Sequence, residues 1–305
     1  MTGKKEWARH WHFAALPGLD LLRARYVRHT FPRHAHDGFT FGAVTCGIEE
    51  LGLSGGTARV GSGGVIMINP EVAHTARAGA PDGWAYATLY PAAHVIREVA
   101  AELGTIRGTP GFAETVADDP RAVHLIHAVH RAAEEGNALA ADSLLRVVLA
   151  HLLRRHGGPL IAREPRTAGA RNALLARAAL EERIADPPSL ATLAAELDTS
   201  PFALLRAFRD VHGMPPHAWL TNARVRRARR LLESGYAPAE AAVVVGFSDQ
   251  PHLNRHFTRI VGVPPGAYRR ERTAVRAVSP PVPLDPPISL GPPPSLDLPA
   301  PLDPL

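Results

Sequence analysis

The sequence contains almost no cysteine. Cys46 is the single cysteine among 305 residues, so the chain can form no internal disulfide and no zinc knuckle made of several cysteines. Such a composition suits a reducing compartment, and we expect a cytoplasmic protein. Cys46 lies in an apolar run typical of a strand, which favours a small buried side chain over a reactive thiol.

Long apolar runs are also missing. The most apolar stretch, ALAADSLLRVVLAHLL, is interrupted by Asp142, Arg146 and His151 and falls short of the roughly 18 apolar residues of a membrane-spanning helix. The first residues, MTGKKEWARHWHFAALPGLDLLR, have lysines but neither an unbroken apolar core nor a small-residue cleavage site. We therefore expect no membrane span and no signal peptide.

Neither sign of charge dominates the chain. Lys and Arg number 34 against 29 Asp and Glu, which gives a net charge of +5. This excess is compatible with a polyanionic partner but does not require one. A chain of 305 residues is long enough to bury two ordinary hydrophobic cores, so we expect two folded domains.

The first part of the sequence has the pattern of a β-domain. From about Tyr26 to Tyr90, short β-branched and aromatic runs are broken by glycine and proline, as is typical of several short antiparallel strands. We assign residues 1–110 to a small all-β barrel or sandwich. Trp84, Tyr86 and Tyr90 are expected in its core.

After Pro91 the composition changes to Ala, Leu, His and Arg at helical spacing. The pattern predicts two helices that end at Gly136 and Gly157. Residues 111–157 would thus form a connecting region that packs on the barrel or on a second subunit. The first of these helices has three histidines at three-residue spacing, which we interpret as its polar face: His124, His127 and His130.

Two later segments have no periodicity. Residues 158–171 are rich in Gly, Pro and charge, and we assign them as the interdomain linker. Residues 273–305 are too rich in proline for a packed core, so we expect a disordered or polyproline tail. Residues 172–272, which lie between these segments, are assigned to an all-α domain.

The all-α domain contains an internal repeat. Residues 204–219, LLRAFRDVHGMPPHAW, align with residues 253–268, LNRHFTRIVGVPPGAY. Eight of the sixteen positions match, counting Trp219 with Tyr268. A repeat of this kind indicates a duplicated supersecondary unit.

Each copy has the pattern of a short helix, a turn and a second helix. In the first copy, Ser189 is expected to cap the short helix and Ser200 the second one. Leu204, Phe208 and Val211 are expected on the inner face of that second helix. The first copy therefore predicts a helix-turn-helix unit.

The second copy repeats this arrangement. Ala239, Ala242 and Val243 are expected to face the core from the short helix, Gly246 permits the turn, and Asp249 caps the second helix. The inner positions of that second helix are Leu253, Phe257 and Ile260.

The stretch PHAWLTNARVRRARRLLESG predicts a helix between the two units. About 17 residues give a rod of roughly 25 Å, which could set the units near the roughly 34 Å between successive major grooves of DNA. Helical pairs also occur as protein-binding or purely structural modules, but the polar outward faces favour DNA. Five arginines of the joining helix could simply be a solvated face: Arg224, Arg226, Arg227, Arg229 and Arg230.

From about Ser189 to Arg272 the sequence resembles the C-terminal domain of AraC/XylS-type transcription regulators. The most specific stretches are AFRDVHGMPPHAWL and RARRLLESGYAPAEAAVVVGFSDQPHLNRHFTRIVGVPPGAYRR. In that family both helix-turn-helix units read DNA. With the outward faces, the resemblance implies eight DNA-binding residues: Phe202, Leu205, Arg206 and Arg209 in the first unit, and Gln250, Pro251, Asn254 and Arg255 in the second.

Two of these positions depart from the expected chemistry. Leu205 cannot form a hydrogen bond with a base edge, although it can contact a thymine methyl group. Pro251 stands where a serine is usual in the family. The detailed readout of bases is therefore specific to this chain.

The barrel region resembles the cupin-like, sugar-binding N-terminal domain of the same regulators. His34 and His36 share one face of a predicted strand, and His74 follows another strand, so the three would line an effector pocket. Three imidazoles could instead hold a divalent metal such as zinc, nickel or iron. Metal-dependent cupins add a glutamate where this sequence has Thr40 and Phe41, so we favour the effector pocket and expect no cofactor.

The sequence thus predicts a transcription regulator that binds double-stranded promoter or operator DNA and is not an enzyme. A small-molecule effector would change the population of DNA-competent arrangements. The resemblance implies a homodimer formed through the connecting helices, with RNA polymerase as a further partner. Three alternatives remain open: a metal-dependent cupin enzyme fused to a DNA-binding domain, a DNA-alkyl acceptor built on the cysteine, and a regulator whose barrel only dimerises.

Overall fold

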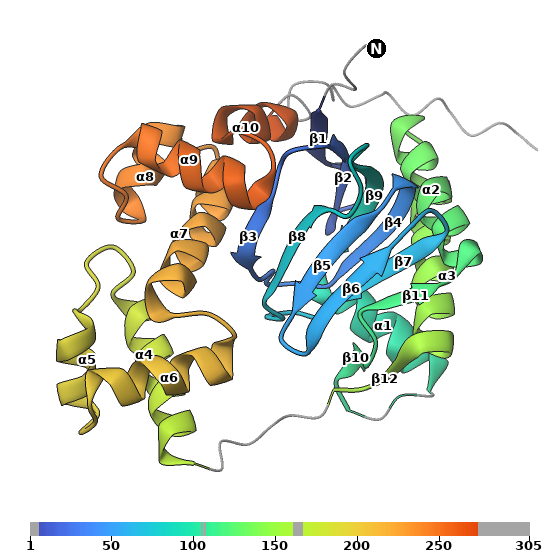
Figure 1. The fold of residues 1–305 in the computed structure, drawn as a ribbon. Helices are drawn as coiled ribbons and strands as arrows, with labels where there is room; N and C mark the ends of the chain where they lie inside the picture. Colours follow the sequence, from blue (N-terminus) through green and yellow to red (C-terminus); the bar gives the residue numbers. More distant parts are fainter. Residues whose placement is uncertain (1–5, 105, 107, 161–166, 274–305) are drawn as a thin grey trace, which may run out of the picture.

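The computed structural model describes residues 6–104, 106, 108–160 and 167–273. Figure 1 shows a sheet-rich N-terminal domain with helices α2 (Pro120–Glu134) and α3 (Ala138–His156) along one side and the C-terminal helices along the other. The predicted β-domain and all-α domain are both confirmed. The predicted proline-rich tail lies outside the described residues, apart from its first residue, Thr273.

Two antiparallel sheets form the N-terminal domain. The larger sheet has six strands, in the spatial order β1 (Trp7–His12), β2 (Leu19–Tyr26), β9 (Trp84–Pro91), β4 (Thr40–Gly47), β7 (Gly64–Ile68) and β11 (Val116–Asp118). The smaller sheet has four, in the order β3 (Phe31–His34), β8 (His74–Ala78), β5 (Glu49–Leu53) and β6 (Gly56–Val60).

Both faces of the larger sheet are covered, and β2 shows why its sequence was hard to interpret. Leu19 and Leu21 pack in a core with the helices, whereas Leu22 and Ala24 pack in a second core with residues of the smaller sheet. A strand that is buried on both faces loses the apolar-polar alternation of a half-exposed strand. For this reason β2 was missed and the strand pattern was expected to begin only at about Tyr26. Strand β1, at the edge of the sheet and partly exposed, was missed with it.

Helices α1 (Ala93–Leu103), α2 and α3 pack in the first of these cores. Asp119 caps α2 by accepting a hydrogen bond from the Ala122 amide at 2.9 Å, and Asn137 caps α3 in the same way. His130 is buried, and its Nε2 lies 3.2 Å from the carbonyl oxygen of Thr88. The predicted polar face of α2 is therefore wrong at His130, because that side of the helix packs on the sheet.

The predicted linker is shorter in the structure. Strand β12 (Gly157–Pro159) pairs with β10 (Pro110–Phe112), and α4 (Ala168–Glu182) begins before residue 171. Residues 161–166 of the linker lie outside the described residues.

Seven helices form the described part of the C-terminal domain: α4, α5 (Leu190–Glu196), α6 (Pro201–His212), α7 (Pro216–Glu233), α8 (Pro238–Val244), α9 (Gln250–Val261) and α10 (Pro265–Thr273). Helices α5 and α6 form the first helix-turn-helix unit, α8 and α9 form the second, and α7 joins them. The predicted caps are confirmed, because Ser189, Ser200 and Asp249 each accept a hydrogen bond from a backbone amide of the first turn. Gly246 adopts a φ of 86° in the second turn, as predicted.

The predicted inner faces need correction at three positions. Val211 is 41% exposed, and on α8 the buried residues are Ala241 and Ala242 rather than Ala239 and Val243. A helix as short as α8 gives too few apolar repeats to fix its inner face from the sequence. The predicted burial of Leu204, Phe208, Leu253 and Phe257 is confirmed.

Cys46 is exposed, so its predicted burial is wrong. The pairing of β4 with β9 shifts register between Val44 and Cys46, and such a bulge interrupts the alternation of inward and outward side chains. Among the described residues, no helix combines the length and apolarity that crossing a membrane requires.

Candidate functional site

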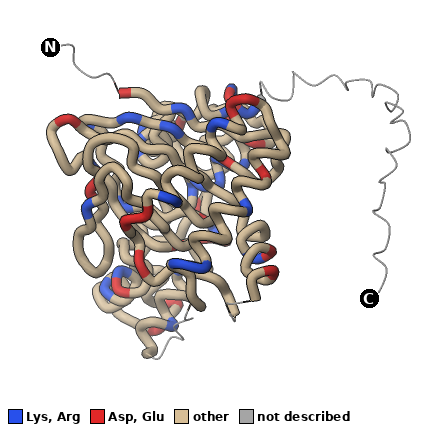
Figure 2. The backbone as a smooth tube through the Cα atoms, turned by 90° about the vertical axis from the view of Figure 1, so that its right-hand side faces the viewer, with Lys and Arg blue, Asp and Glu red and all other residues tan. Residues whose placement is uncertain are grey.

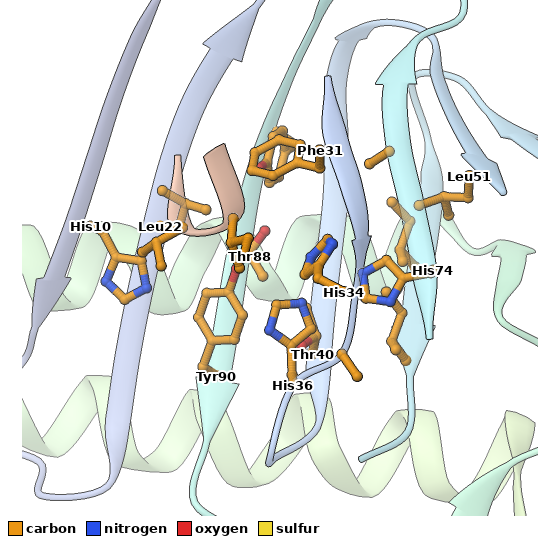
Figure 3. A pocket seen from close by; sticks show the side chains of 18 of the residues that line it. His10, Leu22, Phe31, His34, His36, Thr40, Leu51, His74, Thr88 and Tyr90 are labelled. Atoms are coloured by element: carbon orange, nitrogen blue, oxygen red, sulfur yellow. The ribbon is translucent and has the colours of Figure 1, made fainter. Parts of the chain in front are cut away.

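A cavity lies between the two sheets, and Figure 3 shows side chains that line it. Its volume is about 70 Å³, whereas a single water needs roughly 10–15 Å³ in the same measure. The three predicted histidines all lie in its wall: His34, His36 and His74. The structure thus brings together residues from β3, from the loop after it and from β8.

The three imidazole rings contact one another. The ring centroids of His34 and His74 are 4.3 Å apart, and His36 lies 4.9 Å from the first and 5.2 Å from the second. The Nδ1 atoms of His34 and His74 lie 2.8 Å and 2.9 Å from the carbonyl oxygens of Pro32 and Val72. These contacts fix the orientation of two of the three rings.

Burial disfavours the charged forms of these imidazoles. It lowers the pKa of His34 to about 3 and the pKa of His74 to about 4. The pKa of His36 also lies well below its usual value, through burial and through the charges of neighbouring groups that include Arg226 and Arg229. All three rings are therefore neutral at pH 7.

Three further polar groups in the cavity wall lack a partner within the described residues. The Oγ1 atoms of Thr40 and Thr88 and the Oε2 atom of Glu49 are buried and have no hydrogen bond there. Burial also raises the pKa of the Glu49 carboxyl to about 8. A buried polar group without a partner costs about 1–3 kcal/mol, so these atoms indicate a cavity that receives a polar occupant. Glu49 was missed because a single glutamate at a strand start has no distinguishing sequence signal.

Two tyrosines that were expected in the core line the cavity instead. The wall includes Tyr86 and Tyr90, whereas Trp84 is fully buried as predicted. Tyr90 lies beside His36, with ring centroids 5.7 Å apart. The sequence could place these residues on β9 but could not show that one of its faces borders an open space.

The C-terminal domain forms part of the same wall. Val225, Arg226 and Arg229 of α7 and Ile260 and Val261 of α9 line the cavity together with the sheet residues. Figure 1 shows α7 and α9 beside β3, at the side of the sheets away from α2 and α3. The cavity is therefore bounded by both domains.

Ion pairs connect α7 with the loop after β3. Arg226 is buried, and its Nε lies 2.6 Å from Oδ1 of Asp37. Arg230 Nη1 lies 3.0 Å from the other oxygen of the same carboxylate. The view of the five α7 arginines as a solvated face is therefore wrong for Arg226, although Arg227 is exposed.

A second ion-pair group is centred on Asp20 of β2. Its Oδ2 lies 2.7 Å from Arg272 Nη2 of α10 and 3.6 Å from Arg229 Nη2 of α7. Arg272 is almost completely buried and its guanidinium lies 3.7 Å from the centre of the Tyr268 ring. Sequence reasoning missed these contacts, because nothing in the local pattern pairs β2 with the last helix.

The N-terminal domain, which the sequence predicts to be the sensor, also contacts equivalent glycines of the two repeats. Arg33 Nη1 donates to the carbonyl oxygen of Gly213, and the Tyr26 hydroxyl donates to the carbonyl oxygen of Gly262, each at 3.3 Å. Both glycines end a second helix with positive φ, 70° and 84°. Each unit is thus held by the sensor at the same place in its repeat.

The predicted DNA-binding residues lie on the outer sides of α6 and α9. Phe202 is 70% exposed, and the Arg206 guanidinium lies 5.4 Å from the centre of its ring. Arg209 and all four second-unit residues are exposed, and Leu205 is half-buried. The second-unit residues are Gln250, Pro251, Asn254 and Arg255.

Both of these outer sides border the sensor domain. Residues Phe202, Leu205, Arg206 and Arg209 share a groove with Leu53 and Ser54 of the β5–β6 hairpin. Pro251, Asn254 and Arg255 share another with residues 28–30, which follow β2. Figure 2 shows basic and acidic segments interspersed over the backbone, whereas the described residues that line the second groove include Arg28, Arg255 and Arg259 and no carboxylate.

Comparison with protein families matches two parts of the chain. Residues 16–151 match an AraC-like ligand binding domain, and residues 193–271 match a helix-turn-helix domain. Together the matches cover strands β2 to β11, most of the helices that pack on them, and the helix-turn-helix units from within α5 to α10.

Individual proteins agree with this division. YbfI of Bacillus subtilis, described as an uncharacterized HTH-type transcriptional regulator, is 24% identical over 237 residues, which are 77% of this chain and 86% of that protein. A putative AraC-like transcription regulator of Streptomyces lividans is 31% identical over 145 residues, 45% of this chain and 46% of its own length.

The fold of ToxT from Vibrio cholerae is similar. Its crystal structure aligns with a TM-score of 0.53 at 14% identity and covers 85% of this chain and 99% of that one. A structure of wild-type ToxT with an unsaturated fatty acid bound aligns with a TM-score of 0.50 at 10% identity, over 90% of this chain and 98% of the other.

Proposed function

Because this chain belongs to the AraC-type transcription regulators, with a ligand-binding domain joined to a DNA-binding helix-turn-helix domain, we propose that an effector in the cavity controls its affinity for DNA. The observation that carries this proposal is the composition of the cavity wall, to which α7 and α9 contribute Arg226, Arg229 and Ile260. An occupant of the cavity touches both domains.

Helix α9 joins the two functions in one element. Ile260 and Val261 line the cavity, while Asn254 and Arg255 lie on the outer side of the same helix. A ligand that contacts the cavity wall differently in two arrangements shifts the population between them. Coupling of this kind is typically about 1–3 kcal/mol, or roughly 5- to 150-fold in DNA affinity.

The effector that fits this wall is small and has polar groups. Thr40 and Thr88 offer hydroxyl groups, and Glu49 one carboxyl oxygen, that have no hydrogen bond within the described part of the chain; the other lining residues include Leu22 and Ile66. The ToxT structure with a bound fatty acid supports a small-molecule occupant for a regulator of this fold.

Filling the cavity tests this part of the proposal. Ala76 is buried in the cavity wall, and Ala76→Leu is expected to make DNA affinity independent of small molecules from a cell extract. The measurement is a gel shift on promoter fragments recovered by genome-wide mapping of bound DNA, with and without the extract. Ala191→Leu, on the exposed side of α5, is the control. A full response in the Ala76 variant would contradict the proposal.

We propose the eight outer residues of α6 and α9 as the base-reading residues. Arg206→Ala and Arg255→Ala are each expected to weaken binding to the recovered promoter by about 1–3 kcal/mol, since a bidentate contact to a base is lost. Arg59→Ala, on β6 of the sensor, serves as the control. Unchanged affinity in both arginine variants would show that bases are read elsewhere.

We also propose a homodimer through α3. Leu139 and Val147 on that helix are 78% and 45% exposed, and exposed apolar side chains on one helix support a covered surface. Val147→Glu is expected to convert a dimer to a monomer in sedimentation experiments, and a dimer of unchanged stability would contradict this surface. RNA polymerase, the further partner, is tested by adding it to the complex of the protein with its promoter DNA. Binding is expected to give a second, slower band in the gel shift.

Catalysis is not part of the proposed function. The alkyl-acceptor alternative requires a thiol at the DNA, and Cys46 lies outside the cavity and outside both grooves beside α6 and α9. Its Sγ is 4.0 Å from Arg25 Nη1 at the exposed end of β4. Treatment with an alkylated DNA duplex is expected to leave Cys46 unmodified, as measured by mass spectrometry of the intact chain.

A further inference from the structure

The histidine cluster presents lone pairs rather than protons to the cavity. A carbonyl oxygen only accepts hydrogen bonds, so the short contacts to Pro32 and Val72 place the protons of His34 and His74 on Nδ1. In the neutral rings the Nε2 atoms then keep their lone pairs. The possible ligand atoms of His34, His36 and His74 all lie within 4.8 Å of one another.

Three converging lone pairs fit a cation. They repel one another and an anionic ligand, whereas a transition-metal ion accepts all three. Hydrogen bonding of the second ring nitrogen to a backbone carbonyl is the usual support of a metal-binding histidine. Nitrogen ligands of a tetrahedral zinc lie roughly 3.3 Å apart, given bonds of about 2.0–2.1 Å, so the rings need to approach by an ångström or somewhat more. His36, which is half-buried and follows β3 in a loop, has the most room to do so.

The arginines of the wall do not exclude a cation. Arg226 is neutralised by Asp37 at 2.6 Å, and Arg229 lies 3.6 Å from the Asp20 carboxylate. An anion would therefore meet arginines that already pair with carboxylates. A metal ion would meet three imidazoles that, within the described residues, have no hydrogen bond on the cavity side.

We propose that His34, His36 and His74 bind one divalent first-row transition-metal ion, with at least one coordination position open to the cavity. Imidazole ligands suit zinc, nickel, cobalt and iron, and an open position would accept an oxygen or nitrogen atom of the effector. The site itself needs only the cavity, whereas its effect on DNA binding rests on the proposed sensing function.

The site borders the helix that joins the two units. Arg226 and Arg229 of α7 line the same cavity, so a bound dication changes the electrostatic potential at a wall that both domains share. We expect a severalfold change in promoter affinity on metal loading.

The test uses the full chain, treated with a chelator and then titrated with Co²⁺, whose visible absorption reports coordination by protein ligands. We expect one equivalent to bind, with Zn²⁺ displacing it. His34→Gln and His74→Gln should each weaken binding by roughly 100-fold or more. His124→Gln, at an exposed position of α2, is the matched control and should bind as the unchanged chain does.

The outcomes separate the metal site from the sensing function. If the unchanged chain binds no equivalent of Co²⁺, or if the His34 and His74 variants bind it equally well, the metal site is wrong whatever the variants' stability. If Co²⁺ binds through these residues but promoter affinity is the same with and without Co²⁺, the metal site is confirmed and the proposed effect of metal on DNA binding is contradicted. If the His34 and His74 variants bind no Co²⁺ but small molecules still alter their promoter affinity, the sensing function is supported and does not require a metal ion.

Discussion

The two helix-turn-helix units have matching cores but differ where they meet the sensor. Val211 and Ile260 occupy equivalent positions in the repeat; Val211 is 41% exposed, whereas Ile260 lines the cavity. At the next position, the Nε2 atom of His212 lies 3.2 Å from the carbonyl oxygen of Ala173 in α4, while Val261 also lines the cavity. The duplication kept the internal packing, and among the described residues the second unit contributes to the cavity wall while the first does not.

The largest expected effect is on stability, and it tests the hydrophobic core that the two units have in common. Phe208 and Phe257 are equivalent and fully buried, so Phe208→Ala and Phe257→Ala should each destabilise their unit by about 3–5 kcal/mol. Urea unfolding measures these losses in the free energy of unfolding. Only Phe257→Ala, one turn before Ile260, should also change Co²⁺ affinity at the cavity. An equal change in the Phe208 variant would remove the distinction between the units.

A smaller effect tests how each unit is attached. Asp20→Asn weakens the ion pairs with Arg272 and Arg229 and should cost about 2 kcal/mol, because two largely buried guanidinium groups lose a charged partner. On the first unit's side, Glu71→Gln removes a more exposed pair with Arg177 and should cost at most about 1 kcal/mol. Hydrogen exchange should show faster opening of α8 and α9 in the first variant only. Equal protection in both variants would contradict this ranking.

The same attachment is expected to weaken in acid. Burial opposes ionisation of Asp20, but the hydrogen bond to His12 and the charges of Arg272 and Arg229 hold the pKa of its carboxyl below its usual range. A depressed carboxyl pKa contributes stability that is present above pH 4 and is lost as the pH falls below that value. Asp20→Asn should therefore flatten the acid limb of the stability curve, and an unchanged limb would show that other carboxyls control it.

The smallest effect tests the position at which the units differ most. Val211→Ala removes an exposed side chain and should change stability by less than about 0.5 kcal/mol. Ile260→Ala opens the cavity wall and should cost about 1 kcal/mol, less than a fully buried isoleucine. Thermal unfolding compares the two variants. A larger cost at Val211 would place that residue in an interface of its own.

The sequence was most informative where local rules decide the structure. Ser189, Ser200 and Asp249 could be identified as caps because a helix start needs a side-chain acceptor for its free amides. The alignment of the two repeats predicted the burial of Phe208 and Phe257. The three cavity histidines could be grouped because strand alternation and family resemblance agreed.

Tertiary contacts account for what was missed. Glu49 and Tyr90 have no local feature that marks a cavity wall, and Asp20 meets Arg272 only after the whole chain has folded. Cys46 left its expected face because of a bulge that the sequence does not signal. Long-range pairing decides all of these positions, so no window of neighbouring residues contains the information.

The paired contacts to Gly213 and Gly262 have a consequence for the length of DNA that the protein can span. Arg33 belongs to β3 of the smaller sheet and Tyr26 to the end of β2 in the larger sheet, so one strand of each sheet contacts one unit at its equivalent point. A displacement of β3 relative to β2 changes the distance between the two reading helices. In the proposed function, an effector that moved these strands would therefore alter the spacing of the two units on DNA.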